Sequence, residues 1–174
     1  MQVELASLER HGGKFAHNYR PGELDLNEER VTLMAPPRVT GRVQQSDSKV
    51  TVKGEAAAEL QLECDRCLKP LSVPVFSSFE VGYVTPDTYQ ADSAAELLDE
   101  DLSLSVFNGE VLDIDELVRE QLLLELPAQI LCQQECKGLC QECGGDRNDA
   151  DCKCEDAQID PRWAGLKEIG NRKS

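Results

Sequence analysis

Residues 38–63 read RVTGRVQQSDSKVTVKGEAAAELQLE, and this stretch decides the fold class. It holds three short runs of alternating or β-branched residues, separated by the turn-forming residues 46–48 and by Gly54. Short runs of this kind between turn signals are typical of consecutive antiparallel strands. We therefore predict a β-meander whose strands cover residues 38–45, 49–54 and 56–63.

A fourth strand is predicted over residues 72–84, after the first pair of cysteines. Pro74 has no amide hydrogen to donate to a neighbouring strand, and Gly82 has no side chain to pack. Both residues favour a position at the edge of the sheet or beside a bulge.

The main helix is predicted at about residues 113–126. Asp113 suits the N-cap position, and Glu116 follows it by three residues, as in a capping box. Apolar residues then recur at helical spacing until Pro127 ends the helix. These apolar residues are Ile114, Leu117, Val118 and Leu122.

Together these elements predict an α+β fold, an antiparallel β-rich meander with one main helix, stapled by two four-cysteine zinc sites. The predicted core covers residues 1–131. Residues 132–174 are predicted to form a cysteine-rich zinc-binding segment and a short C-terminal helix packed on the core. Asp160 and Pro161 suit the start of that helix, because aspartate caps a first turn that tolerates proline.

The composition favours a soluble protein of a reducing compartment. The chain has 174 residues and a formal net charge of −15, from 18 basic and 33 acidic residues. Such a charge argues against binding of nucleic acid through a generally basic surface. No apolar run is long enough to span a membrane, and the N-terminal sequence lacks the pattern of a secretory signal. We expect a cytoplasmic protein with no membrane partner.

The eight cysteines form four closely spaced pairs, with the patterns CxxC, CxxxC, CxxC and CxC. In a reducing compartment such pairs bind metal more often than they form disulfides. Zinc takes four thiolates in a tetrahedron, so four pairs predict two closed sites and two zinc ions per chain. An iron–sulfur cluster is the alternative for the same ligands. The predicted metal ligands are Cys64, Cys67, Cys132, Cys136, Cys140, Cys143, Cys152 and Cys154.

Two groupings of the cysteine pairs are open. The more local grouping closes one site across residues 144–151, which have almost no apolar side chain and need a metal to fold. It consists of Cys140, Cys143, Cys152 and Cys154 in one site, and Cys64, Cys67, Cys132 and Cys136 in the other. The rival grouping consists of Cys132, Cys136, Cys140 and Cys143 in one site, and Cys64, Cys67, Cys152 and Cys154 in the other. We favour the local grouping.

One segment has the composition of an RNA contact. Residues 10–20 read RHGGKFAHNYR, which combines basic and aromatic residues and contains no acid. Basic side chains can meet phosphates, and aromatic rings can stack on unpaired bases. The alternative is a solvated loop whose aromatic rings pack on the sheet. The candidate RNA-contact residues are Arg10, Lys14, Phe15, Tyr19 and Arg20.

A further basic strip follows the meander. It consists of Arg38, Arg42, Lys49 and Lys53. On alternating strands such residues are either a contact surface or simply the solvated face of the sheet.

Catalytic residues are not evident in the sequence. His11 and His17 are its two histidines, and neither adjoins a nucleophile pattern or a phosphate-binding glycine loop. Closed four-thiolate sites also leave no position for water or substrate. We therefore expect a protein that is not an enzyme and has no small-molecule substrate.

Four segments carry a family resemblance. They read ECDRCLKP, DIDELVREQLLLELP, CQQECKGLCQECGGDRNDADCKC and DPRWAGLKEI, at residues 63–70, 113–127, 132–154 and 160–169. At these residues the chain resembles the YceD family of bacterial and plastid proteins, the large ribosomal RNA subunit accumulation proteins. The resemblance implies a non-enzymatic factor that supports the accumulation of large-subunit ribosomal RNA, and hence ribosome assembly.

The partner is expected to be large-subunit ribosomal RNA or a basic ribosomal protein. The acidic residues between positions 92 and 125 would attract such a protein, although they also suit a solvated loop and the polar face of a helix. A zinc-ribbon adaptor unconnected with ribosomes is the alternative function.

Overall fold

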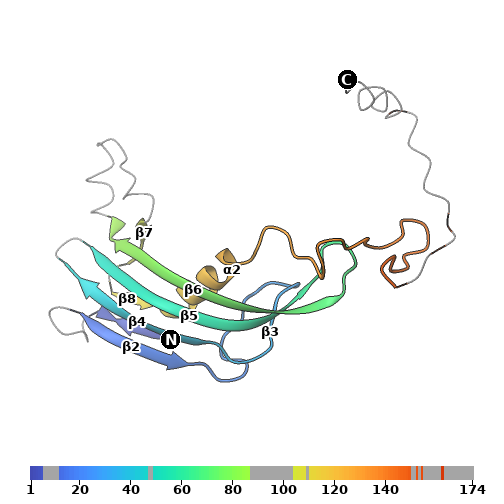
Figure 1. Cartoon of the computed structure of the whole chain (residues 1–174). Helices are drawn as coiled ribbons and strands as arrows, with labels where there is room; N and C mark the ends of the chain where they lie inside the picture. Colours follow the sequence, from blue (N-terminus) through green and yellow to red (C-terminus); the bar gives the residue numbers. More distant parts are fainter. Residues whose placement is uncertain are drawn as a thin grey trace. The chain divides into compact units, whose positions relative to one another are not determined.

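A mostly antiparallel, six-stranded sheet forms the centre of the fold (Figure 1). The computed structural model describes residues 1–5, 12–46, 49–86, 104–108, 110–149, 152, 154 and 162. In the sheet the strand order is β2, β4, β5, β6, β7, and β3 also pairs with β5. The elements are β1 (Gln2–Glu4), β2 (Gly13–Asn18), β3 (Thr32–Leu33), β4 (Arg38–Gln45), β5 (Val50–Glu63), β6 (Pro70–Val84), β7 (Leu104–Val106), β8 (Val111–Asp113) and the helix α2 (Ile114–Leu124).

The predicted meander is confirmed, with one correction. β4, β5 and β6 are consecutive antiparallel neighbours, but the two strands predicted on either side of Gly54 are the single strand β5. Gly54 lies opposite Gly41 within the sheet, and a Cβ added at Gly54 would lie 2.8 Å from the ring of Phe79. The glycine therefore makes room for an aromatic ring of the next strand instead of ending a strand.

The edge position predicted for the fourth strand holds at Pro74 but not at Gly82, which is paired on both sides. β6 pairs with β5 along its whole length, whereas β7 pairs in parallel with Gly82, Tyr83 and Val84 alone. Among the described residues, the other side of positions 70–81 has no partner strand. Pro74 lies in this stretch, where its missing amide hydrogen costs no pairing.

The helix begins where the sequence predicts it. The Asp113 side chain accepts hydrogen bonds from the backbone amides of Asp115 and Glu116, at 3.0 and 3.2 Å, and so satisfies two amides that have no partner within the helix. α2 ends at Leu124, slightly before the predicted end.

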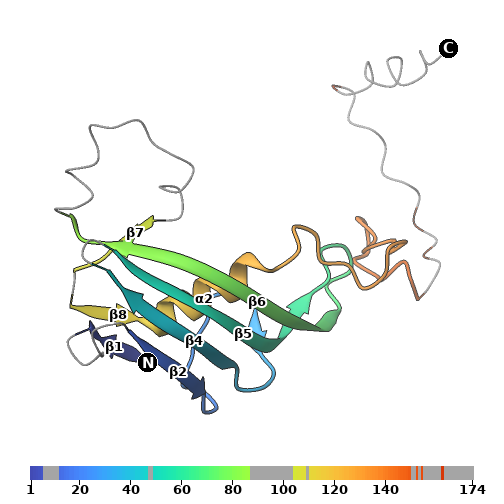
Figure 2. The same ribbon diagram turned by 60° about the vertical axis from the view of Figure 1, so that its left-hand side comes forward.

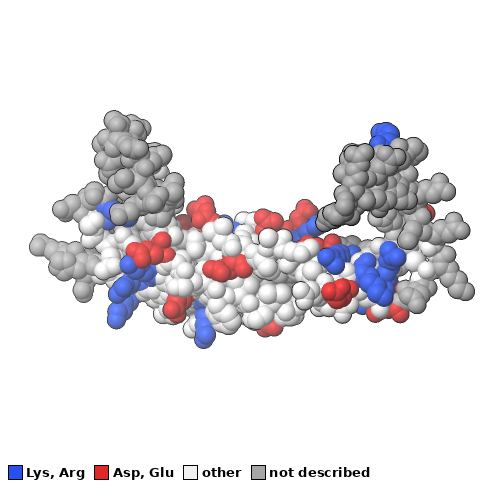
Figure 3. Space-filling view, turned by 45° about the horizontal axis from the view of Figure 1, so that its top comes forward, with Lys and Arg blue, Asp and Glu red and all other residues white. Residues whose placement is uncertain are grey.

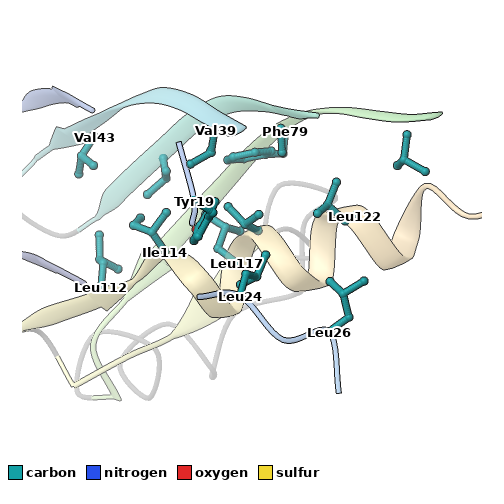
Figure 4. Close-up of a cluster of buried hydrophobic side chains, with 14 of the residues drawn as sticks. Tyr19, Leu24, Leu26, Val39, Val43, Phe79, Leu112, Ile114, Leu117 and Leu122 are labelled. Carbon is teal, nitrogen blue, oxygen red and sulfur yellow. The ribbon is translucent and has the colours of Figure 1, made fainter. Parts of the chain in front are cut away.

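The hydrophobic core lies between the sheet and α2. Figure 2 shows the helix along one face of the sheet, and Figure 4 shows its apolar side chains pointing at those of the strands. Burying one such side chain fully stabilises the fold by about 1.5–3 kcal/mol. The fully or almost fully buried side chains include Val39, Val43, Val52, Leu60 and Leu62 of the sheet, and Ile114, Leu117, Val118 and Leu122 of the helix.

The chain divides into two compact units. Unit 1 consists of Met1–Glu63 and Pro70–Ile130, and unit 2 of Cys64–Lys69 and Leu131–Ser174. The loop Cys64–Lys69, which the sequence analysis placed in the core, thus belongs with the cysteine-rich segment. The predicted C-terminal helix lies outside the described residues apart from Arg162, and its packing on the core stays a prediction. No helix in the described part of the chain is long and apolar enough to cross a membrane.

Candidate metal centres

The first cysteine cluster brings together two segments of unit 2. The sulfur atoms of Cys64, Cys67, Cys132 and Cys136 all lie within 4.8 Å of one another. The Cys64 and Cys136 sulfurs are 3.8 Å apart, and the Cys67 and Cys132 sulfurs are 3.6 Å apart. Four sulfurs around a zinc ion at about 2.3 Å would be separated by about 3.8 Å in a regular tetrahedron. The cluster therefore fits a tetrahedral thiophilic ion.

A tight turn places the two cysteines of the first pair. The Leu68 amide donates to the Cys64 carbonyl, and the Cys64 amide donates to the Lys69 carbonyl, each at 2.9 Å. Leu68 adopts a left-handed conformation with φ of 60°, which is uncommon for a residue other than glycine. This turn directs both thiols to the same side, as a metal ligand pair requires.

Backbone amides stabilise the thiolate of Cys64. Burial alone would raise the pKa of its thiol, but hydrogen bonds from the amides of Cys67, Arg66 and Cys132 outweigh burial and lower the pKa to about 6. One of these bonds, from the Cys132 amide to the Cys64 sulfur, measures 3.4 Å. By contrast, burial and hydrogen bonding to Cys136 raise the pKa of Cys132 to about 12. The four thiols thus cannot all ionise unless a cation compensates their charge.

The second cluster is more exposed and more local. The sulfurs of Cys140, Cys143, Cys152 and Cys154 also lie within 4.8 Å of one another. The amides of Cys143 and Glu142 lower the pKa of Cys140 to about 6. Gly144 allows this turn because its φ of 69° lies in the left-handed region, and its amide donates to the Cys140 carbonyl at 2.9 Å.

The two clusters follow the more local of the two groupings that the sequence left open. The rival grouping, with Cys132 and Cys140 in one site, is not the one in the structure. Each cluster of four cysteines can hold a metal ion. Four sulfur ligands fill a tetrahedral shell and leave no open position, so such sites shape the backbone rather than react.

Asn148 connects the loop of the second cluster with the first cluster. Its side-chain Nδ2 donates to the Cys136 sulfur at 3.3 Å, and its Oδ1 accepts from the Lys137 amide at 2.8 Å and from Gln133 at 3.2 Å. Asn148 itself lies between Cys143 and Cys152 in the chain. It therefore acts on a sulfur of one cluster from the loop that the other cluster closes.

Lys69 and Arg66 make a second connection within unit 2. Lys69 forms ion pairs with Asp149 at 2.8 Å and Asp146 at 3.0 Å, and these two carboxylates raise the pKa of its ammonium group. Arg66 donates to the Cys136 carbonyl at 2.8 Å, and its own carbonyl accepts from the Leu139 amide at 3.1 Å. Sequence reasoning missed Asn148, Lys69 and Arg66, since no spacing rule marks a residue that supports a ligand from outside.

The family comparison matches both clusters and the main helix. A family model described as "Large ribosomal RNA subunit accumulation protein YceD" matches residues 52–170. The chain belongs to the YceD family. The resemblance found in the sequence is thereby confirmed, and the matched range includes all eight cysteines.

Several relatives of this YceD protein are known by sequence. A protein of Mycobacterium tuberculosis is 29% identical to it over 97% of this chain and 81% of its own length. The protein YlbN of Bacillus subtilis is 26% identical over 95% of this chain and 92% of its own length. An Arabidopsis thaliana protein named "Large ribosomal RNA subunit accumulation protein YCED homolog 1, chloroplastic" is 25% identical over 77% of this chain and 48% of its own length. No solved structure matches the chain significantly.

The two aromatic residues among the RNA-contact candidates of this YceD protein lie on the core side of the sheet. Tyr19 is 4% exposed and donates from its hydroxyl to Asp115 at 2.7 Å, and Phe15 packs against the core. The Tyr19 ring is therefore not available for stacking, whereas the Phe15 ring is only partly buried. Lys14 and Arg20 are exposed, and Arg10 lies outside the described residues.

The acidic segment is described in part. Residues 87–103 lie outside the described part of the chain. On α2, Glu116 and Glu120 are exposed, as the polar face of an amphipathic helix requires, whereas Asp115 binds the N-terminal amino group of Met1 and the hydroxyl of Tyr19.

Proposed function

We propose that this YceD protein is a non-catalytic factor that supports the accumulation of large-subunit ribosomal RNA and the assembly of the large ribosomal subunit. The observation that carries the proposal is the family match over residues 52–170. The name of the Arabidopsis relative, a large ribosomal RNA subunit accumulation protein, supports the same role. The partner would be large-subunit ribosomal RNA or a basic ribosomal protein, met in the cytoplasm.

The proposal includes two zinc ions per chain in a structural role. Eight cysteines in two groups of four supply eight sulfur ligands, the number that two tetrahedral ions need. Zinc would supply a fixed link between the segments that carry its ligands. In the first site, this chain's own turn at Cys64 to Leu68 presents two sulfurs, and the amides that point at Cys64 hold it as a thiolate. In the second site, the metal would replace the hydrophobic core that residues 144–149 lack.

A non-catalytic role also agrees with where the potential metal ligands and the histidines lie. Within the described residues, the two groups of cysteines are the sites where several potential metal ligands converge. Both histidine positions lie far from them in sequence, and His17 pairs with Glu23 at 2.9 Å. The chain therefore offers shape and surface to a partner rather than a reactive group.

The experiment that tests the proposal is depletion of the protein in its own cells, followed by sedimentation of the ribosomal particles. Loss of an assembly factor should reduce mature large subunits and leave free small subunits in excess. A normal profile after complete depletion would favour an adaptor role unconnected with ribosomes.

A further inference from the structure

One face of the six-stranded sheet carries no covering element among the described residues. We call it the open face; it is the face turned away from α2, and its side chains form rows across strands β2, β4, β5 and β6. Side chains in one row are direct neighbours, because paired residues of adjacent strands point to the same side of a sheet. In strand order the rows consist of Lys14, Arg42, Lys53 and Glu80, then Ala16, Thr40, Glu55 and Ser78, and then Asn18, Arg38, Ala57 and Phe76.

The three rows carry four cations and two carboxylates, a local excess of positive charge in a chain with a formal charge of −15, while Glu59 and Glu63 lie on the same face further along β5. Lys14, Arg38 and Arg42 are exposed, and none of them forms an ion pair with a described residue. Lys53 pairs with Glu80 at 2.7 Å, so these two charges cancel each other. Figure 3 shows blue side chains toward the left with red ones among them, and a largely white surface in the middle that carries scattered red side chains.

The uncharged part of the open face is hollowed. A hollow of about 490 Å³ is lined by Arg38, Thr40, Glu55, Ala57, Phe76 and Ser78. Its floor is made of small side chains, whereas Phe76 and Arg38 stand at either side of Ala57. A second hollow of about 500 Å³ shares Thr40, Glu55 and Ser78 with the first and extends to Lys14 and Arg42.

Phe76 is a large apolar residue that is exposed on this face. Its side chain is 69% exposed, in a protein with four phenylalanines, while Phe15 and Phe79 pack against or within the core. An exposed phenyl ring beside an exposed guanidinium forms a stacking platform for a planar ligand. An unpaired nucleic-acid base fits the space above Ala57, between the two groups.

The distances along the strands fit a ligand longer than one nucleotide. Arg38 and Arg42 are four residues apart on β4, which corresponds to about 14 Å along an antiparallel strand. A base over Ala57 and a phosphate at Lys14 and Arg42 therefore belong to different nucleotides of one strand. Glu55 lies between these positions, where its carboxylate can accept a hydrogen bond from a base amino group but would repel a phosphate.

We propose that the open face binds single-stranded RNA, with Phe76 and Arg38 as the base-stacking site and Lys14 and Arg42 as the phosphate contacts. The inference rests on the proposed function, under which the natural ligand of the open face would be ribosomal RNA. A basic protein fits less well at the end of this face that holds Lys14, Arg38 and Arg42, because these unpaired cations would repel it. Unpaired RNA is favoured over a duplex, since a base must leave its stack to meet a phenyl ring.

The test is binding of the zinc-loaded, full-length protein to a fluorescein-labelled, single-stranded RNA dodecamer of mixed sequence, followed by fluorescence anisotropy. Phe76→Ala should weaken binding by about 5- to 150-fold, the range found when one base loses its aromatic partner. Leu124→Ala is the matched control, because Leu124 is 76% exposed on α2, away from the open face, and its loss should change nothing. Circular dichroism of each variant verifies that the fold is retained.

The phosphate contacts are tested separately, by the salt dependence of RNA binding. Arg42→Gln should lower the slope of the logarithm of the binding constant against the logarithm of salt concentration by about 0.7, the value for one lost phosphate contact on a single strand. Arg30→Gln removes the same charge from an exposed position outside the open face and should leave the slope unchanged. Equal effects of Arg42→Gln and Arg30→Gln would overturn the proposed surface.

The outcomes separate this inference from the proposed function. If depletion lowers large-subunit RNA and the variant that combines Phe76→Ala with Arg42→Gln restores it fully, the open face is not the RNA site although the proposed function stands. If the dodecamer does not bind, or if a basic ribosomal protein binds and is lost with the same variant, the inference is likewise overturned. If depletion has no effect on ribosomal RNA, the proposed function itself is wrong.

Discussion

Replacing Asn148 by aspartate should weaken metal binding at the first cluster. The Asn148 Nδ2 donates to the Cys136 sulfur at 3.3 Å, and a carboxylate oxygen in its place would accept only and would carry a negative charge. The bond that Asn148 Oδ1 accepts from the Lys137 amide, 2.8 Å long, would be kept. Asn148 Nδ2 also donates to Asp146 Oδ1 at 2.6 Å, so the substitution also replaces a hydrogen bond within the loop by a contact between two carboxylates.

The size of the effect follows from that geometry. Two like charges about 3.3 Å apart repel each other by about 1.3 kcal/mol at the dielectric constant of water. Loss of the hydrogen bond adds about 1 kcal/mol. The sum, about 2–3 kcal/mol, corresponds to a metal affinity about 30- to 150-fold lower. This agrees with the loss of about 10- to 100-fold that is usual when a hydrogen-bond partner of a metal ligand is removed.

The assay is competition between the protein and a chromophoric chelator for zinc, with cadmium NMR to separate the signals of the two clusters. Gln141→Glu is the control, because it adds one negative charge at an exposed position beside the second cluster. Asn148→Ala, which removes the donor without adding charge, should fall between the wild type and Asn148→Asp. An unchanged affinity of the first cluster in Asn148→Asp, or an equal loss in Gln141→Glu, would refute the reasoning.

The other predictions concern metal content, the second cluster and the core. Elemental analysis of the purified protein should find two zinc ions per chain; one ion per chain, or iron with visible absorbance, would contradict this. Exchanging both Cys152 and Cys154 for serine should remove one ion and leave the hydrogen-exchange protection of unit 1 intact, with the first cluster still able to bind metal but more weakly because the loop of Asn148 loses its metal; loss of both ions would contradict the observed grouping. Burial would raise the pKa of Asp115, but hydrogen bonds from the amino group of Met1 and the hydroxyl of Tyr19 hold this pKa below its usual value. The ionised carboxylate therefore stabilises the fold fully above its unfolded-state pKa of about 3.9. This stabilisation is lost as the pH falls through the folded-state pKa. Asp115→Asn should therefore lower the free energy of unfolding in urea by about 1.5–3 kcal/mol near neutral pH, with the difference from wild type shrinking below about pH 4, and a difference independent of pH would contradict the ion pair.

The sequence predicts those parts of the fold that depend on local patterns. The apolar spacing and the Asp113 cap predict α2, and the edge position of β6 follows from Pro74, because in both cases the deciding group lies within a few residues. The role of Gly54 could not be predicted, since it depends on a ring from another strand, that of Phe79. Burial of Tyr19 likewise depends on Asp115, which lies 96 residues away in the chain.

The candidate site shows the same division. Spacing predicts which cysteines are candidate metal ligands, and loop length favours the grouping that the structure has. Asn148 could not be found in this way, because an asparagine in a polar loop looks like any turn residue until its contact with Cys136 is known. The open face depends on strand register, which brings Arg38 and Phe76 into one row through Ala57 although they lie on different strands.

The most direct test of the proposed function is the ratio of large-subunit to small-subunit ribosomal RNA in depleted cells. We predict that depletion lowers this ratio, that the intact chain restores it, and that Cys64→Ser fails to restore it, because that substitution removes a ligand of the first cluster. Cys64→Ser protein must accumulate to the level of the intact chain for the comparison to hold. An unchanged ratio after complete depletion would contradict the proposal that this YceD protein supports the accumulation of large-subunit ribosomal RNA.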